Sequence, residues 1–250
     1  MTAGRISLPS TYPLHPMEEF GRLSDGERDA VIKLVGKPHA VERGDTIRRE
    51  GDPAAGFFLL SEGWVLASML LPAGRRQVLT IHLPGDVLGT SSMSSDEAVE
   101  TLTAITPAAV SAISLTDFGQ VIQKHPRIAV SFLLSAQRER ITLMDQLASV
   151  GRTRAEQRMA ALLVDLTERL GPLQLAEHST FDLPLTQEEI GDVLGLTAVH
   201  VNRTLKILEI DGLIARSGRC VSILAMDRLV ELGGRPRRPV RSGLDWLPAR

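Results

Sequence analysis

Between residues 38 and 115, short apolar runs alternate with glycine-containing turns at near-even intervals. The runs include FFLL, WVLASML, QVLTIHL and AVSAISL, and the turns include Gly44-Asp45, Gly51-Asp52, Glu62-Gly63, Ala73-Gly74 and Gly85-Asp86. Many short strands at such spacing are typical of an antiparallel barrel or roll. The pattern therefore predicts a small antiparallel β-domain.

Helical patterns flank this β-rich region. Residues 24–35 begin with Ser24, a suitable N-cap, and Glu27 stands where a capping box requires it. A short helix is expected over residues 117–124. After the break at His125, a long helix is expected to begin at Pro126 and to continue to about residue 151, because proline suits the first turn of a helix.

The long helix carries two apolar stripes with alternating spacings of three and four residues. The first stripe contains Leu133, Ala136, Arg140, Leu143, Leu147 and Val150, and the second contains Val130, Leu134, Gln137, Ile141, Met144 and Ala148. One stripe can pack on the helix's own β-domain and the other on a second copy of the helix, so we expect the first stripe to form a homodimer interface. The simpler alternative is a single amphipathic helix that lies on its own domain.

Residues 185–224 predict a winged helix-turn-helix. Thr186 caps a first helix with Glu189 at the capping-box position, Gly195 provides the tight turn, and Thr197 caps a second helix that runs to about Ile210. A strand over residues 213–216, a Ser-Gly turn and a strand over residues 220–224 then form a hairpin, the wing.

The second of these helices has a core side and a polar side. Val199, Asn202, Arg203 and Lys206 share the face opposite the apolar side chains. Arg203 can form two hydrogen bonds to guanine, and Asn202 can do the same to adenine. We therefore expect the base-reading residues to be Val199, His200, Asn202 and Arg203, and the phosphate contacts to be Thr186, Gln187, Thr197, Lys206, Arg216 and Arg219. The alternative is an ordinary solvated helix face.

Composition narrows the class of protein. The 250-residue chain has room for two modest domains, and its formal net charge of −2 means that any DNA affinity must come from a local patch. No apolar run approaches the length of a membrane span, and residues 1–10 lack the apolar core of a signal peptide, so we expect a cytoplasmic protein that does not enter a membrane. The single cysteine excludes an internal disulfide framework, and we find no catalytic motif and expect no enzyme and no cofactor.

The run QEEIGDVLGLT, followed by VNRTLKILE and GLI, resembles the helix-turn-helix of the cAMP receptor protein/FNR (Crp/Fnr) family of bacterial transcription regulators. The resemblance covers about residues 20–230. It implies an α+β fold with an N-terminal antiparallel β-roll like a cyclic nucleotide-binding domain, a long dimerisation helix and a C-terminal winged helix-turn-helix. The corresponding limits are an N-terminal arm at 1–19, the roll at 20–125, the dimerisation helix and hinge at 126–151, the DNA-binding domain at 152–232 and a basic tail at 233–250. It further implies a homodimer on a two-fold DNA operator, with RNA polymerase as a further partner.

Two departures from the family are informative. Many members place an acid, which accepts a hydrogen bond from cytosine, where this chain has Val199. In cyclic-nucleotide members, a turn that begins Gly-Glu and ends Arg-Ser or Arg-Thr binds the ribose and the phosphate. This chain keeps Gly89, but has Thr90 in place of the glutamate and Glu100-Thr101 in place of Arg-Ser. A carboxylate repels a phosphate, so we expect no cyclic-nucleotide control; the stretch is either vestigial or a pocket for another small molecule that gates DNA binding.

Three further features are open to interpretation. Haem-based relatives use a histidine or cysteine of the roll, but His82 is more simply explained as a hydrogen-bonded structural residue. Cys220, in the expected wing, is interpreted as a small apolar filler rather than a redox switch. The tail, Gly234–Arg250, is rich in arginine, proline and glycine; it either contacts DNA or the partner subunit, or is a free end.

Overall fold

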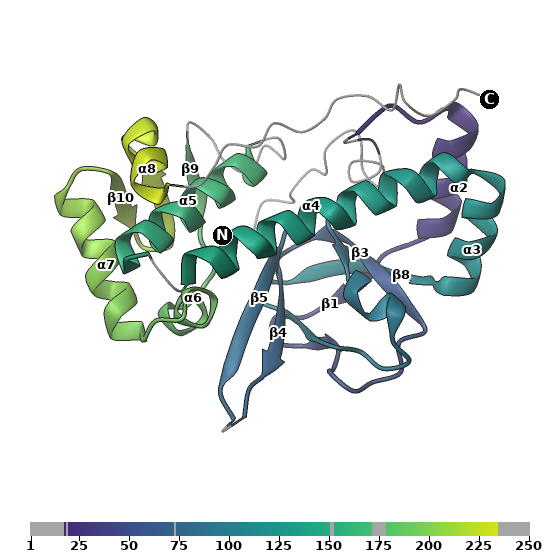
Figure 1. Cartoon of the computed structure of the whole chain (residues 1–250), viewed down its shortest axis with the longest axis horizontal. Coiled ribbons are helices and arrows are strands. Elements are labelled where there is room, and N and C mark those ends of the chain that lie inside the picture. The colour runs from purple at the N-terminus through teal and green to yellow at the C-terminus, as the bar shows by residue number, and fades with distance from the viewer. Residues whose placement is uncertain (1–17, 19, 73, 151–152, 172–178, 235–250) are drawn as a thin grey trace. The chain divides into compact units, whose positions relative to one another are not determined.

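The computed structural model describes residues 18, 20–72, 74–150, 153–171 and 179–234 (Figure 1). It contains an N-terminal β-roll with associated helices and a C-terminal unit of helices around a small sheet. The expected N-terminal arm (apart from Glu18), the hinge residue 151 at the end of the expected dimerisation helix, residue 152 and the tail from residue 235 onward lie outside the described residues.

The β-roll consists of two four-stranded sheets. One sheet has the order β1-β8-β3-β6 and the other the order β2-β7-β4-β5. The strands are β1 (His39–Val41), β2 (Thr46–Arg48), β3 (Gly56–Glu62), β4 (Val65–Leu70), β5 (Arg76–His82), β6 (Val87–Leu88), β7 (Thr101–Ala104) and β8 (Ala108–Ser114). Every strand pair with a defined register in the roll is antiparallel. The predicted antiparallel roll is confirmed, and between β6 and β7 the chain forms a short 3-10 helix, η1 (Thr90–Ser94).

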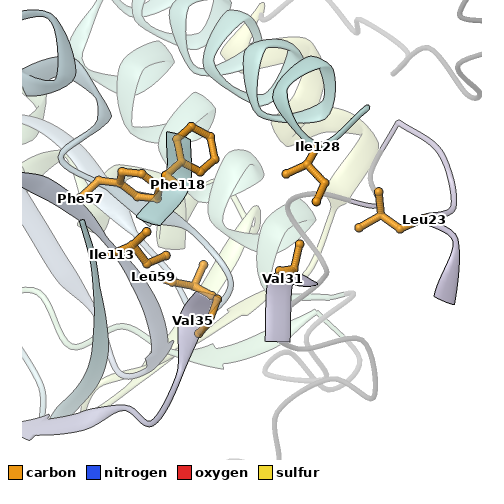
Figure 2. Close-up of a cluster of buried hydrophobic side chains, with 8 residues drawn as sticks. All are labelled: Leu23, Val31, Val35, Phe57, Leu59, Ile113, Phe118 and Ile128. Atoms are coloured by element: carbon orange, nitrogen blue, oxygen red, sulfur yellow. The ribbon is translucent and has the colours of Figure 1, made fainter. Parts of the chain in front are cut away.

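Helices α2 (Asp25–Val35) and α3 (Leu115–Lys124) close one side of the roll. The predicted capping box of Ser24 and Glu27 is present at the start of α2, and Ser114 caps α3. Their apolar faces meet the roll in one buried cluster, formed by Leu23, Val31, Val35, Phe57, Leu59, Ile113, Phe118 and Ile128 (Figure 2). The rings of Phe57 and Phe118 meet edge to face with centroids 5.1 Å apart, so the cluster has a defined aromatic centre.

The long helix α4 (Pro126–Val150) begins at the proline that the sequence indicated. Its roll-facing side is formed by Ile128 and Ser131, which are fully buried, together with Phe132, whose ring lies 4.8 Å from that of Phe118. This side follows neither of the two predicted stripes, so the expectation that one of them packs on the roll is wrong. The reason is that α4 meets the roll through a third face near its start, formed by Ile128, Ser131 and Phe132.

The C-terminal unit is built on α5 (Ala155–Leu170), whose residues Met159, Leu163 and Leu166 are completely buried. It continues with β9 (Thr180–Asp182), α6 (Gln187–Leu194), α7 (Ala198–Ile210), β10 (Ile214–Ser217), β11 (Cys220–Ile223) and α8 (Met226–Gly233). The strand order β10-β11-β9 places the predicted wing hairpin in a three-stranded antiparallel sheet. The sequence did not indicate β9 or α8. Across the described residues, no helix is both long and apolar enough to cross a bilayer.

Candidate nucleic-acid interface

Helices α6 and α7 are joined by the turn that the sequence predicted. Thr186 and Glu189 form a complete capping box, with the Thr186 amide donating to the Glu189 carboxylate at 2.7 Å. Thr197 caps α7 by accepting a hydrogen bond from the His200 amide at 3.3 Å. Gly195 ends α6 in the left-handed conformation, with φ at 66°, which explains the choice of glycine.

The turn is held tightly against α6. A Cβ atom on Gly191 would lie 2.6 Å from the Leu196 carbonyl oxygen, so any larger residue would push the two helices apart. Behind the turn, the buried side chains of Ile190, Val201 and Leu205 pack the two helices together. The relative orientation of α6 and α7 is therefore fixed by close packing, as base recognition in a groove requires.

The opposite face of α7 is open to solvent. Val199 is 80% exposed, and His200, Asn202, Arg203 and Lys206 are also exposed. A shallow depression beside this helix is lined by Gln187, Ala198, Val199, Asn202, Arg203 and Lys206. The structure thus brings together residues predicted for base contacts and residues predicted for phosphate contacts, with an apolar valine among them.

The two wing arginines are less free than the sequence suggested. Arg216 donates to Glu209 at 2.7 Å, and this bond lowers the pKa of the Glu209 carboxyl. Arg219 donates to Asp182 at 2.9 Å, and both of these side chains are more than half exposed. Because each arginine already has a carboxylate partner, a phosphate must compete with that partner, and each contributes less net positive charge than Lys206.

The interpretation of Cys220 as an apolar filler is wrong, because its side chain is exposed. Along β11 the buried positions are Val221 and Ile223, so Cys220 lies on the opposite, exposed face of the strand. Cys220 therefore lies on the surface of the wing.

The residues predicted for the dimer interface are largely uncovered in the single chain. Leu133 is 55%, Leu143 is 39% and Leu147 is 77% exposed; Arg140 is also exposed, and Ala136 is half-buried. The side chain of Val150 lies outside the described part of the structure. The second stripe is half-buried at Val130 and Leu134 and exposed from Gln137 onward, with Met144 59% exposed.

The residues at the positions of the family's nucleotide-binding turn lie around η1. Gly89 precedes η1 in the left-handed conformation, and the Thr90 hydroxyl donates to the Glu139 carboxylate of α4 at 3.3 Å. Glu100 is buried and accepts a 2.6 Å hydrogen bond from Ser91, while Thr101 accepts one from the Glu50 amide at 3.0 Å. These residues are engaged in contacts within the roll.

Sequence reasoning missed Arg48, at the end of β2. Its side chain is buried beside η1, and its guanidinium lies 3.9 Å from the Glu100 carboxylate. Burial lowers the pKa of Arg48, against the opposing effect of Glu100 and then Asp52, although a guanidinium keeps its proton in proteins. A buried arginine is rare, and no local pattern around Arg48 could have indicated it.

His82 lies at the end of β5, almost fully buried, with Nδ1 3.7 Å from the Asp86 carboxylate. Within the described residues, no group of three or more histidine, cysteine, aspartate and glutamate side chains is arranged to hold a metal ion.

The geometry defines a DNA-binding protein with a winged helix-turn-helix, and comparison with known proteins identifies its family. A model of the Crp-like helix-turn-helix domain matches residues 157–232, and a model of the cyclic nucleotide-binding domain matches residues 38–125. The nitrogen fixation regulation protein FixK of Bradyrhizobium diazoefficiens is 34% identical over 190 residues, which cover 76% of this chain and 78% of FixK. The transcriptional regulatory protein btr of Bordetella pertussis is 29% identical over 231 residues, covering 92% of this chain and 90% of btr.

Among solved structures, FixK2 from Bradyrhizobium japonicum matches with a TM-score of 0.73 and 28% identity, covering 80% of this chain and 98% of FixK2. The chain belongs to the Crp/Fnr family of transcription regulators. The fold class, the family resemblance and the main function expected from the sequence are confirmed.

Proposed function

We propose that this regulator binds a two-fold symmetric DNA site as a homodimer, with α7 of each subunit in the major groove. The observation that carries the proposal is the exposed face of α7, where Val199, Asn202, Arg203 and Lys206 surround one depression on a rigidly packed helix pair. A helix presented in this way fits the width of the major groove, and its N-terminal residues reach the base edges.

The residues on this face take different roles in the proposal. Arg203 and Asn202 contact base edges through paired hydrogen bonds, His200 lies beside them, and Val199 packs against a thymine methyl group. The phosphate contacts come from Thr186, Gln187, Thr197 and Lys206, with Arg216 and Arg219 contributing only after they leave their carboxylate partners. The exposed Val199 supports a DNA sequence preference different from that of relatives with an acidic residue at this position.

Dimerisation is assigned to α4. Its exposed side chains, Leu133, Leu143 and Leu147, leave an apolar surface that solvent disfavours and that a second copy can cover. A dimer would place two α7 helices on half-sites about one helical turn of DNA, roughly 34–36 Å, apart. The proposed limits are residues 20–125 for the roll, 126–151 for the dimer helix and hinge, and 152–232 for the DNA-binding domain.

Control by a cyclic nucleotide is not part of the proposal. Glu100 stands where a phosphate would have to bind, and it is already engaged by Ser91 and faced by Arg48. A protein that regulates transcription acts at the chromosome, which in bacteria places it in the cytoplasm, and RNA polymerase is its expected partner there. The alternative is a roll that senses another small molecule and gates DNA binding.

Selection of DNA from a random duplex pool with the purified, ligand-free protein tests both the proposal and the ligand-gated alternative. The proposal expects enrichment of a two-fold sequence whose half-sites are about one helical turn apart. Enrichment only after addition of a cell extract of small molecules would favour the gated alternative. No enrichment by either preparation, or enrichment of an asymmetric single site, would contradict the proposal.

A further inference from the structure

The Arg48 guanidinium is buried in the roll beside η1. The Arg48 side chain projects from the end of β2, and only 7% of the residue is exposed. One terminal nitrogen, Nη1, donates to the Gly56 carbonyl at 2.9 Å. The other, Nη2, donates to the Ser92 hydroxyl at 2.9 Å and to the Gly89 carbonyl at 3.2 Å. The guanidinium therefore ties β2 to β3 and to η1.

The wall opposite the guanidinium is acidic and preorganised. The Glu100 carboxylate lies 3.9 Å from Nη2 and is held by the 2.6 Å hydrogen bond from Ser91. The ring of Phe58 lies 5.7 Å from the guanidinium carbon, a distance at which a cation is attracted to an aromatic face. Carbonyl oxygens, a carboxylate and an aromatic ring are the groups that recognise a guanidinium.

The fit around Arg48 leaves little free space. A Cβ atom added to Gly89 would collide with Nη2, so glycine at this position allows the guanidinium to approach the backbone of η1. Among the described residues, the buried Nε atom of Arg48 has no hydrogen-bond partner, so the site grips the end of the side chain.

We infer that the roll contains a guanidinium-binding site, formed by Gly56, Gly89, Ser92 and Glu100, that is filled in cis by Arg48. The charge arrangement is the reverse of the one that the family resemblance implies for cyclic-nucleotide members, where an arginine of the chain faces a phosphate of the ligand. In this chain the wall of the site carries a carboxylate, that of Glu100, and the group that it faces is a cation, the Arg48 guanidinium. The roll thus carries its own ligand and selects cations over anions.

The site is connected to the long helix. η1 is held on its inner side by the Arg48 bonds to Gly89 and Ser92, and on its other side by the 3.3 Å bond from Thr90 to Glu139 of α4. Filling the site orders η1, and an ordered η1 presents Thr90 to α4. The Arg48 side chain therefore holds this segment in place in the absence of any dissociable ligand.

Chemical rescue in the full-length protein tests the inference. The R48A variant removes the atoms of ethylguanidinium and leaves the rest of the site in place. We expect R48A to lower the melting temperature by roughly 6–20 °C, because it strands a buried carboxylate. Millimolar ethylguanidinium should then raise the melting temperature of R48A saturably, whereas ethylurea, its uncharged isostere, should not. The wild-type protein and R49A, which removes the exposed neighbouring arginine, should show no rise.

If R48A does not fold, a substitution of Glu100 gives a second measurement. E100Q keeps the shape of the side chain and removes its charge, and we expect it to accelerate backbone hydrogen exchange in residues 89–95 relative to wild type and R49A. Unchanged exchange in E100Q would overturn the inference. It would also be overturned by an R48A protein that is as stable as wild type, or one that responds equally to ethylguanidinium and ethylurea.

These readouts use no DNA. The inference rests on the proposed absence of cyclic-nucleotide control, but its failure would leave the assignment of α7 and α4 untouched. Conversely, failure to select an operator would leave the rescue result unaffected.

Discussion

Arg203 and Lys206 lie on one face of α7, one turn apart, yet they are expected to contact different parts of the DNA. If Arg203 binds a guanine through two hydrogen bonds, R203A should cost about 1–3 kcal/mol at the selected site and much less on random DNA. The measurement is a titration of each variant on selected, single-base-changed and random duplexes at two salt concentrations. Equal loss on all three duplexes would instead make Arg203 a phosphate contact.

Lys206 provides the contrasting case. K206A should weaken binding to selected and random duplexes alike and reduce the salt slope by about one unit, because a phosphate contact releases a counterion on any sequence. R216A should have a smaller effect on the salt slope, since Glu209 already compensates its charge at 2.7 Å. A larger loss of salt slope in R216A than in K206A would show that the Arg216–Glu209 pair opens on DNA.

Glu139 is expected to make the roll sensitive to pH. Burial raises the pKa of its carboxyl; Asp86 and Glu100 add to this, while His82 and the Thr90 hydroxyl oppose it. A raised pKa means that the folded state holds the proton more tightly than the unfolded state. Its stabilising contribution is therefore complete below the unfolded value of 4.5 and is lost as the pH rises through the folded value.

The E139Q variant removes this dependence. We expect E139Q to melt at a higher temperature than wild type at pH 8, with the difference shrinking toward pH 4, because glutamine stays neutral and can still accept the Thr90 hydrogen bond. Melting temperatures measured between pH 4 and pH 8 test this, with E97Q, at an exposed glutamate, as the control. A constant difference across the whole range would contradict the assignment.

At single positions, the sequence indicated local geometry well and long-range partners poorly. The caps at Ser24, Thr186 and Thr197 were predictable, because a capping hydrogen bond joins residues three apart. The contact between Arg48 and Glu100 was not, since the two residues are far apart along the chain and an arginine is normally placed on the surface.

Among the described elements, α4 carries the most exposed large hydrophobic side chains, and its role can be tested directly. Changing Leu143 and Leu147 together to aspartate should give a monomer with weak DNA binding, since four carboxylates would meet in the proposed interface. Analytical ultracentrifugation measures the outcome. The control is I32D, which places a charge at a side chain of α2 that is 50% exposed. A double variant that remains dimeric would place the interface elsewhere.

Element boundaries show where pattern reading is limited. The helix-turn-helix and the wing were predicted within a residue or two, because caps, glycine turns and alternation coincide there. β9 was missed because it has three residues and forms only by pairing with β11. α8 was missed because Ala225 offers no side-chain cap. The helix is held instead by packing on α5, where a Cβ atom on Gly233 would lie 3.0 Å from the Ala161 backbone nitrogen.

For the whole protein, control by a ligand would require two states, one that binds DNA and one that does not. A ligand can shift the equilibrium between them only by its difference in affinity for the two states. An arginine of the chain cannot dissociate, so a site filled by Arg48 cannot respond to the concentration of a small molecule. The expected behaviour is DNA binding that is the same with and without added nucleotide.

Titration calorimetry with cAMP and cGMP, paired with DNA titrations, tests this expectation. Millimolar nucleotide should give no binding heat, no rise in melting temperature and no change in DNA affinity, because the phosphate would face Glu100 and the space beside η1 is taken. E100R alone should not create a nucleotide site, since it would set a second guanidinium close to that of Arg48 and lower the melting temperature. Binding should require R48A together with E100R and T90E, which empties the site and restores the base and the acid that the family resemblance implies. A micromolar dissociation constant for either nucleotide in the wild-type protein would show that Arg48 yields its place to a ligand, and the roll would then be a sensor.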